Sequence, residues 1–122
     1  MDKFRKAVEA RDADALVASL AEDVVFRSPV VFKPYQGREM VGHLLRAVLR
    51  IFTDFEYVSE LGDGKGKTAL EFKAKVGGRD IQGIDLGTVN EAGLVTELTV
   101  FVRPFSATQA LMEAMRAELG LS

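Results

Sequence analysis

The feature that most constrains the fold is a succession of strand-like segments between residues 55 and 103, joined by short glycine-containing turns. One segment alternates apolar Leu70, Phe72, Ala74 and Val76 with charged Glu71, Lys73 and Lys75. This alternation is typical of a strand with one buried face. Turn sequences at 62–66, 77–78 and 90–93 separate it from predicted strands at 55–61, 80–89 and 94–103. Because short turns join antiparallel neighbours, these segments predict an antiparallel meander.

Helical patterns flank this meander. Apolar residues with three-to-four spacing predict a long helix over 38–52, with its buried face formed by Val41, Leu44, Leu45, Val48, Leu49 and Phe52. A first helix carries Phe4, Ala7, Val8 and Arg11 on one face. Asp12 or Asp14 is placed to cap a second short helix that carries Leu16, Val17 and Leu20.

The remaining segments complete the expected order of elements. Residues 24–28 predict a strand that ends at Pro29, and 30–36 predict a loop with two prolines. Pro104 ends the last strand, and Ser106 to Gln109 form a capping-box pattern for a final helix. That helix has one apolar stripe, formed by Leu111, Met112, Met115 and Leu119. Helices kept to one face of an antiparallel sheet make an α+β domain, expected to span residues 1–122.

The last two predicted strands are apolar on both faces. Leu98, Val100 and Val102 lie on one face, and Ile84, Leu86 and Phe101 on the other. A sheet that is apolar on both sides needs a second covering layer, and few helices remain to provide it. We therefore expect a homodimer formed through the outer sheet face.

Composition excludes several classes of function. Apolar residues make up 48% of the 122 residues and charged residues 28%, with a formal net charge of −2, so no basic surface for nucleic acid or anionic lipid is expected. The absence of cysteine excludes disulfides and cysteine-based zinc sites, and a single histidine, His43, excludes a multi-histidine metal site. We expect no metal and no cofactor. Without a signal-peptide pattern or a long apolar run, the expectation is a cytoplasmic protein with no membrane contact.

Asp85 is the main candidate for chemistry, because it lies within a predicted strand between Gly83 and Gly87. Strand side chains alternate, so all three residues share one face. Glycine weakens a strand interior, and this pair suggests that space is cleared for something else to approach the carboxylate. In an apolar setting the pKa of this carboxyl would rise, giving an acid that can donate or accept a proton. The alternative is a structural aspartate that is hydrogen-bonded to a neighbour or exposed.

A family resemblance rests on four segments of the chain and on the order of its elements. The segments are Asp23-Val24-Val25-Phe26, Gly37-Arg38-Glu39, Gly83-Ile84-Asp85-Leu86 and Asn90-Glu91-Ala92-Gly93-Leu94-Val95. Over essentially its whole length the chain resembles the nuclear transport factor 2-like (NTF2-like) superfamily, and most of all its SnoaL-like and ketosteroid-isomerase-like branch. The resemblance implies a strongly curved antiparallel β-sheet wrapped around helices. Such a cone-shaped α+β barrel, also called cystatin-like, would enclose an apolar pocket.

The resemblance also assigns positions to the residues of the steroid isomerase site. Ser28 stands where that family has its general-base aspartate, and Phe4 where it has its oxyanion-hole tyrosine. The supporting tyrosines correspond to Leu20 and Leu45, whereas Asp85 matches the oxyanion-hole aspartic acid. A proton shuttle between carbon atoms needs a carboxylate base, which serine cannot replace. Ordinary steroid isomerisation is therefore disfavoured, whereas SnoaL-type polyketide cyclases, for which one pocket acid can suffice, remain compatible with Asp85.

The remaining candidates are residues expected to line the pocket around Asp85: Phe4, Phe26, Ser28, Tyr35, Leu44, Tyr57, Phe72, Leu98, Val100 and Val102. His43 is assigned to the polar face of the long helix, and Lys3, Arg5 and Lys6 to a solvated face.

Two functions stay open. One is acid–base chemistry of isomerase, cyclase or lyase type on an apolar small molecule, centred on Asp85. The other is a non-catalytic small-molecule-binding protein or dimeric scaffold of the same fold.

Overall fold

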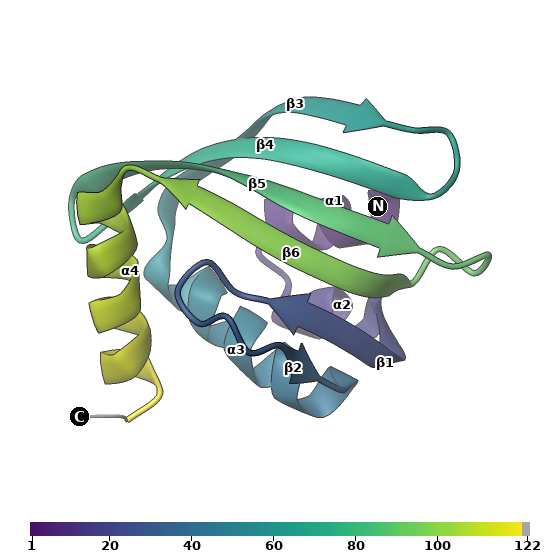
Figure 1. The fold of residues 1–122 in the computed structure, drawn as a ribbon, viewed down its shortest axis with the longest axis horizontal. Helices are drawn as coiled ribbons and strands as arrows, with labels where there is room; N and C mark the ends of the chain where they lie inside the picture. Colours follow the sequence, from purple (N-terminus) through teal and green to yellow (C-terminus); the bar gives the residue numbers. More distant parts are fainter. Residues whose placement is uncertain (121–122) are drawn as a thin grey trace.

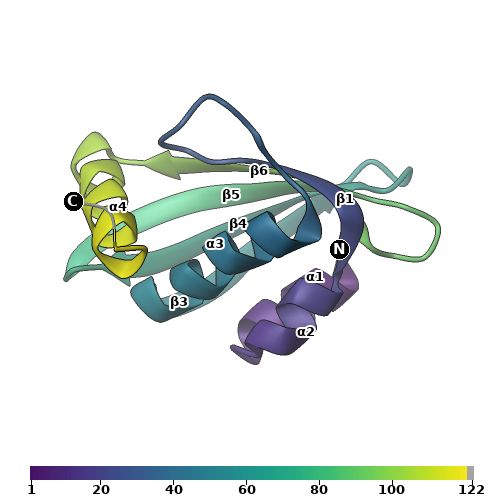
Figure 2. The same cartoon turned by 90° about the horizontal axis from the view of Figure 1, so that it is seen from below.

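The computed structural model describes residues 1–120 and shows a curved six-stranded sheet with helices against its concave face (Figures 1 and 2). The strands are β1 (Leu20–Arg27), β2 (Tyr35–Gln36), β3 (Thr53–Gly62), β4 (Lys67–Val76), β5 (Arg79–Val89) and β6 (Val95–Arg103). The helices are α1 (Asp2–Glu9), α2 (Ala13–Ala18), α3 (Arg38–Ile51) and α4 (Phe105–Glu118). This architecture confirms the predicted α+β class. The last two residues of the expected domain lie outside the described part of the chain.

The meander is present in the predicted order, with β3, β4, β5 and β6 as successive antiparallel neighbours. Gly77 and Gly78 make the tightest turn, with φ of +57° and +79°, and they pair Val76 with Arg79. Two consecutive positive φ values define the hairpin turn that glycine favours. The sheet continues beyond the meander because β1 pairs with β6 in parallel and β2 pairs with β1.

Three boundary predictions were wrong. β1 begins at Leu20 rather than at residue 24, and Tyr35–Gln36 form a short edge strand where a loop was expected. α4 begins at Phe105, directly after Pro104, so Ser106 lies inside the helix and its side chain does not cap it. The cap predicted for α2 is confirmed at Asp12, whose carboxylate accepts a hydrogen bond of 3.0 Å from the Ala15 amide.

The core lies between the concave sheet face and the helices. Its fully buried large side chains come from α2, α3 and the three strands β1, β4 and β6: Leu16, Leu20, Val24, Val41, Leu70, Phe72, Val76, Val95 and Leu98. α3 crosses beneath the sheet, whereas α4 packs at one end of it and buries only Ala107 and Leu111 (Figure 2). None of the helices in the described chain is long and apolar enough to cross a membrane.

The space above the two glycines that flank Asp85 is occupied by the protein itself, which corrects the idea that it is cleared for a ligand. A Cβ on Gly83 would come within 2.5 Å of Phe72 Cζ and 2.6 Å of the Phe101 carbonyl oxygen. A Cβ on Gly87 would meet the end of the Met1 side chain. Gly83 therefore allows the Phe72 ring, which also packs against Phe52 and Phe55, to lie directly on the sheet.

Candidate functional site

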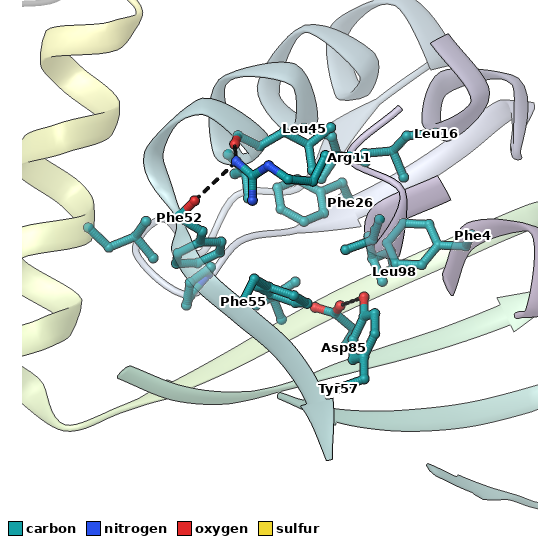
Figure 3. Close-up of a pocket in the computed structure, with 16 residues that line it drawn as sticks. Phe4, Arg11, Leu16, Phe26, Leu45, Phe52, Phe55, Tyr57, Asp85 and Leu98 are labelled. Carbon is teal, nitrogen blue, oxygen red and sulfur yellow. Dashed lines mark hydrogen bonds between the residues drawn. The ribbon is translucent and has the colours of Figure 1, made fainter. Parts of the chain in front are cut away.

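An apolar cavity of about 70 Å³ lies between the sheet and the helices (Figure 3). Its walls are formed by apolar side chains from every layer of the fold: Phe4, Val8, Leu16, Phe26, Pro29, Leu45, Val48, Leu49, Phe52, Phe55, Leu98, Val100 and Leu111. Among residues 1–120, three polar side chains reach it, those of Arg11, Tyr57 and Asp85. Small-molecule sites commonly have this composition, with few polar groups in an apolar wall.

Asp85 enters the cavity from the middle of the sheet. It lies on β5, opposite Leu70 of β4 and Val100 of β6, and its residue is 8% exposed. The inward direction of residues 83, 85 and 87 is confirmed by the alternating burial of β5. Asp85 therefore places a carboxyl group in surroundings that are otherwise almost entirely apolar.

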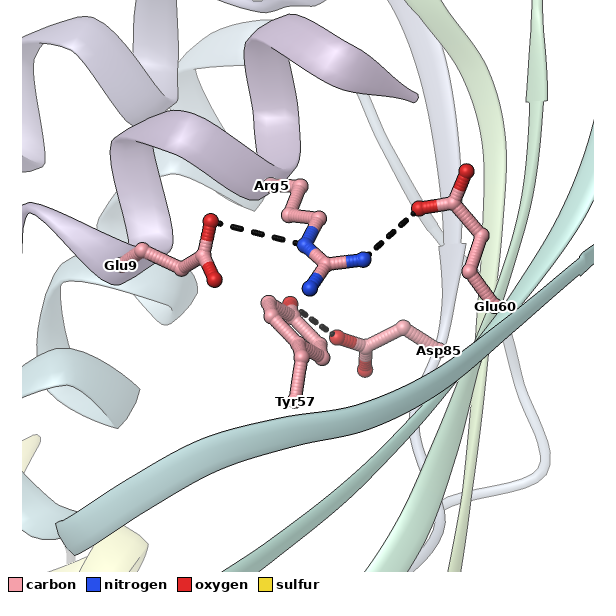
Figure 4. A network of polar contacts seen from close by, with 5 residues as sticks. All are labelled: Arg5, Glu9, Tyr57, Glu60 and Asp85. Carbon is pink, nitrogen blue, oxygen red and sulfur yellow. Dashed lines mark hydrogen bonds and ion pairs between the residues drawn. The ribbon is translucent and has the colours of Figure 1, made fainter.

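Tyr57 of β3 is the hydrogen-bond partner of this carboxyl group. Its hydroxyl donates to Asp85 Oδ2 at 2.7 Å, reaching from two strands away (Figures 3 and 4). Its ring packs edge-on against Phe55 and Phe72, with centroid separations of 4.9 and 6.5 Å. These contacts fix the direction of the hydroxyl. Asp85 Oδ1 receives no hydrogen bond from any described residue, which leaves it available to a molecule in the cavity.

Burial changes the acidity of both groups. Removal from water raises the pKa of Asp85 to about 6, although the Tyr57 hydrogen bond opposes this rise by stabilising the anion. Burial also raises the pKa of Tyr57, and the negative charge of Asp85 adds to that effect. At neutral pH the pair therefore combines a neutral phenol with a carboxyl group that is mostly ionised but close to its midpoint. A pKa near the working pH is what general acid–base catalysis requires.

Arg5 covers the outer side of Tyr57. Its guanidinium carbon lies 5.5 Å from the centre of the Tyr57 ring. Nη1 of Arg5 is 2.9 Å from Glu60 Oε1, and Nε is 3.4 Å from Glu9 Oε1 (Figure 4). The two glutamates thus hold the cation over the ring. The sequence predicted a solvated face for Arg5. Its four-residue spacing from Glu9 was a signal of their ion pair, but no local signal pointed to the contact with Tyr57.

The structure brings together six of the predicted site residues around the cavity: Phe4, Phe26, Tyr57, Asp85, Leu98 and Val100. Ser28, Tyr35 and Leu44 instead line a neighbouring cavity of about 340 Å³ beneath α4. Phe72 and Val102 line neither cavity: Phe72 packs behind Phe55, and Val102 is partly buried against the core.

The two cavities are separated by a small group of shared side chains: Phe26, Pro29, Val48 and Leu111. A ligand that moved these side chains apart would join the two volumes. The joined space would reach the roughly 300–1,000 Å³ typical of small-molecule sites. Enlargement would therefore take place on the α4 side of Asp85.

The position assigned to a general base holds no base in this chain. The Ser28 hydroxyl accepts hydrogen bonds from the Val31 and Val30 amides at 3.0 and 3.3 Å, so it closes its own loop. Phe4, at the position of a tyrosine, presents only a phenyl ring to the cavity. The phenol next to Asp85 comes instead from β3. His43 is exposed on α3, and residues 1–120 contain no cluster of three His, Asp or Glu side chains that could hold a metal ion.

Comparison with known structures defines the class of protein. The chain is 38% identical to a steroid delta-isomerase from Pseudomonas aeruginosa, with a TM-score of 0.92, covering 98% of this chain and 88% of that one. It is 39% identical to an uncharacterised bacterial protein with a cystatin-like fold from Silicibacter pomeroyi, with a TM-score of 0.91, covering 98% and 84%. An NTF2-like protein from Cytophaga hutchinsonii shares the fold at 21% identity and a TM-score of 0.65, covering 84% and 85%. The fold is thus NTF2-like, with relatives among steroid isomerases.

The family follows from the sequence match. Residues 1–98 match the model of the SnoaL-like domain. The chain therefore belongs to the SnoaL-like family, as its sequence segments predicted. No curated protein matches it significantly.

Proposed function

We propose that the protein binds an apolar small molecule in the cavity and that Asp85 transfers protons on it, in a reaction of isomerase type. One observation carries this proposal: the only carboxyl group on the cavity, in the described chain, is buried and held by Tyr57, and its second oxygen faces the apolar space. A carboxyl group is costly to bury without a compensating role. The relationship to a steroid delta-isomerase supports the same class of chemistry.

The reaction would use one carboxyl group twice. Asp85 Oδ1, as the carboxylate, takes a proton from a carbon next to a carbonyl group, and the C–H electron pair forms an enolate. The carboxylic acid then returns this proton to another carbon of the conjugated system and becomes a carboxylate again. No other reactant is required. Tyr57, hydrogen-bonded to Oδ2, fixes the position of the carboxyl group through both steps.

The pH dependence of the reaction tests this proposal. Conversion of cyclohex-3-enone into the conjugated cyclohex-2-enone is expected to rise through pH of about 6 and then level off, because the reactive form is the ionised Asp85. Ultraviolet absorbance of the conjugated product measures the rate. Removing the Tyr57 hydroxyl in Tyr57→Phe should shift the midpoint to higher pH, since that hydrogen bond lowers the pKa of Asp85. A rate above background that does not change between pH of about 5 and 8 would contradict the proposal.

A second candidate function is ligand binding without chemistry. It is favoured by the presence of Ser28 at the position assigned to the general base. Among the described residues, the site has one carboxyl group and no further base, because the Ser28 hydroxyl is used within its own loop. The same assay separates the two functions. If cyclohex-2-enone and other apolar ketones bind but cyclohex-3-enone is not converted, the protein is a binding protein.

We also propose that the outer sheet face forms a homodimer. Ile84 and Phe101 are directly opposite each other on β5 and β6, and they are 39% and 54% exposed. Phe101→Glu would place a charge in this interface and is expected to convert the dimer into a monomer, as measured by sedimentation velocity. Phe32→Glu is the control, because Phe32 is fully exposed in the loop before β2. A wild-type monomer at tens of micromolar, or a dimer that survives Phe101→Glu, would overturn the interface.

A further inference from the structure

Arg11 is the one cation on the cavity, within the described chain, and its backbone fixes its position. The residue follows α1 in the left-handed region, with φ of +53°. The Arg11 amide bonds to the Val8 carbonyl at 3.0 Å, and the Asp12 amide bonds to the Ala7 carbonyl at 3.0 Å. This turn directs the side chain across to the end of α3. Nη2 of Arg11 donates there to the Leu49 carbonyl and, at 3.2 Å, to the Phe52 carbonyl (Figure 3).

No carboxylate among residues 1–120 forms an ion pair with Arg11. Ion pairs in the described chain use Arg5, Arg27, Arg46, Arg50, Lys73 and Lys75, but not Arg11. Its two hydrogen bonds both come from Nη2, so Nη1 and Nε remain available as donors. Arg11 is exposed to solvent while it also lines the cavity, which places it at the opening.

Arg11 and Asp85 enter the cavity from opposite walls. Arg11 belongs to the helical layer, at the turn between α1 and α2, whereas Asp85 belongs to β5 of the sheet (Figure 3). Apart from Tyr57, the side chains that line the space around them are apolar. A ligand that satisfied both ends would carry one anionic group at the opening and an apolar body inside. The ionised Asp85 would repel that anion and so prevent the reverse orientation.

We propose that the substrate is an apolar carboxylic acid whose carboxylate binds Arg11. Because Nη2 already donates to two carbonyl groups, the carboxylate would accept a charge-assisted hydrogen bond from Nη1 or Nε of the guanidinium group. This inference rests on the proposed function, because it takes the cavity to be the site at which Asp85 acts. It adds the substrate class and an orientation, with the acid group at the opening and the reacting carbon next to Asp85.

Two probes that differ only in their polar end test the inference. 4-Phenylbutyrate and 4-phenylbutan-1-ol are titrated into the protein by calorimetry at pH 8. Wild type is expected to bind the acid about tenfold more tightly than the alcohol, in the range of an exposed charge-assisted contact. Arg11→Gln should lower the affinity for the acid about tenfold and so remove this preference, whereas Arg11→Lys should keep part of it. Arg46→Gln is the matched control, since Arg46 pairs with Asp14 on the surface and does not line the cavity.

The outcomes separate this inference from the proposed function. If Arg11→Gln retains the preference for the acid, or if wild type binds both probes equally, Arg11 does not anchor a carboxylate, although Asp85 chemistry on cyclohex-3-enone can still hold. If wild type binds neither probe at millimolar concentration, the proposal that Arg11 binds a substrate carboxylate is overturned. Turnover of cyclohex-3-enone then tests the proposed function of Asp85 separately. Circular dichroism of each variant verifies that α3, which Arg11 caps, is intact. Arg11→Lys keeps the test valid if Arg11→Gln unfolds.

Discussion

Asp85→Asn is expected to stabilise the folded protein by up to roughly 3 kcal/mol at pH 8 while lowering the proposed proton transfer by ~10²–10⁴-fold. The stability gain follows from the pKa of Asp85, which burial raises from 3.8 to about 6. Each pKa unit corresponds to about 1.4 kcal/mol of free energy. Asparagine carries no charge to bury, and its amide oxygen can still accept the Tyr57 hydrogen bond.

The sign of the pH dependence follows from proton binding. With a folded pKa above the unfolded one, the folded state holds more protons between pH of about 4 and 6. The free energy of unfolding of wild type therefore falls as pH rises through this window, and the contribution of Asp85 is constant above it. Asp85→Asn lacks this decline, so the two proteins should differ little near pH 4 and most above pH 7.

Chemical denaturation of both proteins at a series of pH values measures this effect. The difference between wild type and Asp85→Asn removes the contributions of the other titrating groups, since those are shared. Asp80→Asn is the control, because Asp80 is exposed on the same strand and pairs with Lys75. If the difference between wild type and Asp85→Asn is independent of pH, Asp85 is not ionised in a buried site, and its proposed role as a base falls with it.

Gly83→Ala is expected to destabilise the protein by about 3 kcal/mol, the upper part of the range for overpacking a core. The new methyl group would lie 2.5 Å from Phe72 Cζ and 2.6 Å from the Phe101 carbonyl oxygen. The Phe72 ring is fixed by Phe52 and Phe55, and the carbonyl belongs to the neighbouring strand, so neither can move without disturbing the sheet. Thermal and denaturant unfolding measure the loss.

Gly87→Ala is the matched control on the same face of the same strand. Its methyl group would meet only the end of the Met1 side chain, which is flexible and can move aside. We expect a cost below about 1 kcal/mol. Equal losses in the two variants would mean that the strand needs glycine for its backbone conformation rather than for the Phe72 ring. The double variant Gly83→Ala/Phe72→Leu should cost less than the sum of its parts, because the smaller side chain relieves the clash with the ring and leaves only the one with the Phe101 carbonyl oxygen.

Local chemistry made much of the fold predictable from sequence. The alternation of apolar and charged residues predicted correctly that Leu70 and Phe72 are buried, and the glycine pair at 77–78 predicted the hairpin turn. The predicted cap of α2 is found at Asp12. Each of these signals acts within a few residues. Predictions failed where neighbours far along the chain decide the structure: β1 starts at Leu20 because that residue pairs with Val95 of β6, and Tyr35 forms a strand because it pairs with Phe26.

In the candidate site, too, local features were predicted correctly and long-range contacts were not. The alternation of side chains along β5 was sufficient to predict that Asp85 points inward. The apolar residues of the neighbouring segments were sufficient to predict an apolar environment for it. The phenol next to the carboxyl group was assigned only as a general lining residue, because Tyr57 reaches Asp85 across an intervening strand. Arg5 and Arg11 were placed on helix faces, since nothing local shows that one covers Tyr57 and the other caps α3.

The meander, the helices and the inward direction of Asp85 could be predicted from sequence, because strand and helix periodicities are properties of the local backbone. The surroundings of Asp85 depend instead on how the sheet and the helices pack together. Curvature of the sheet brings Phe72 onto Gly83, Tyr57 to the carboxyl group, and Arg11 to the far wall of the cavity. These contacts join residues that lie 11 to 41 positions apart in the sequence, such as Phe72 with Gly83, and Arg11 with Phe52. Their geometry depends on how the layers pack, which no local pattern encodes.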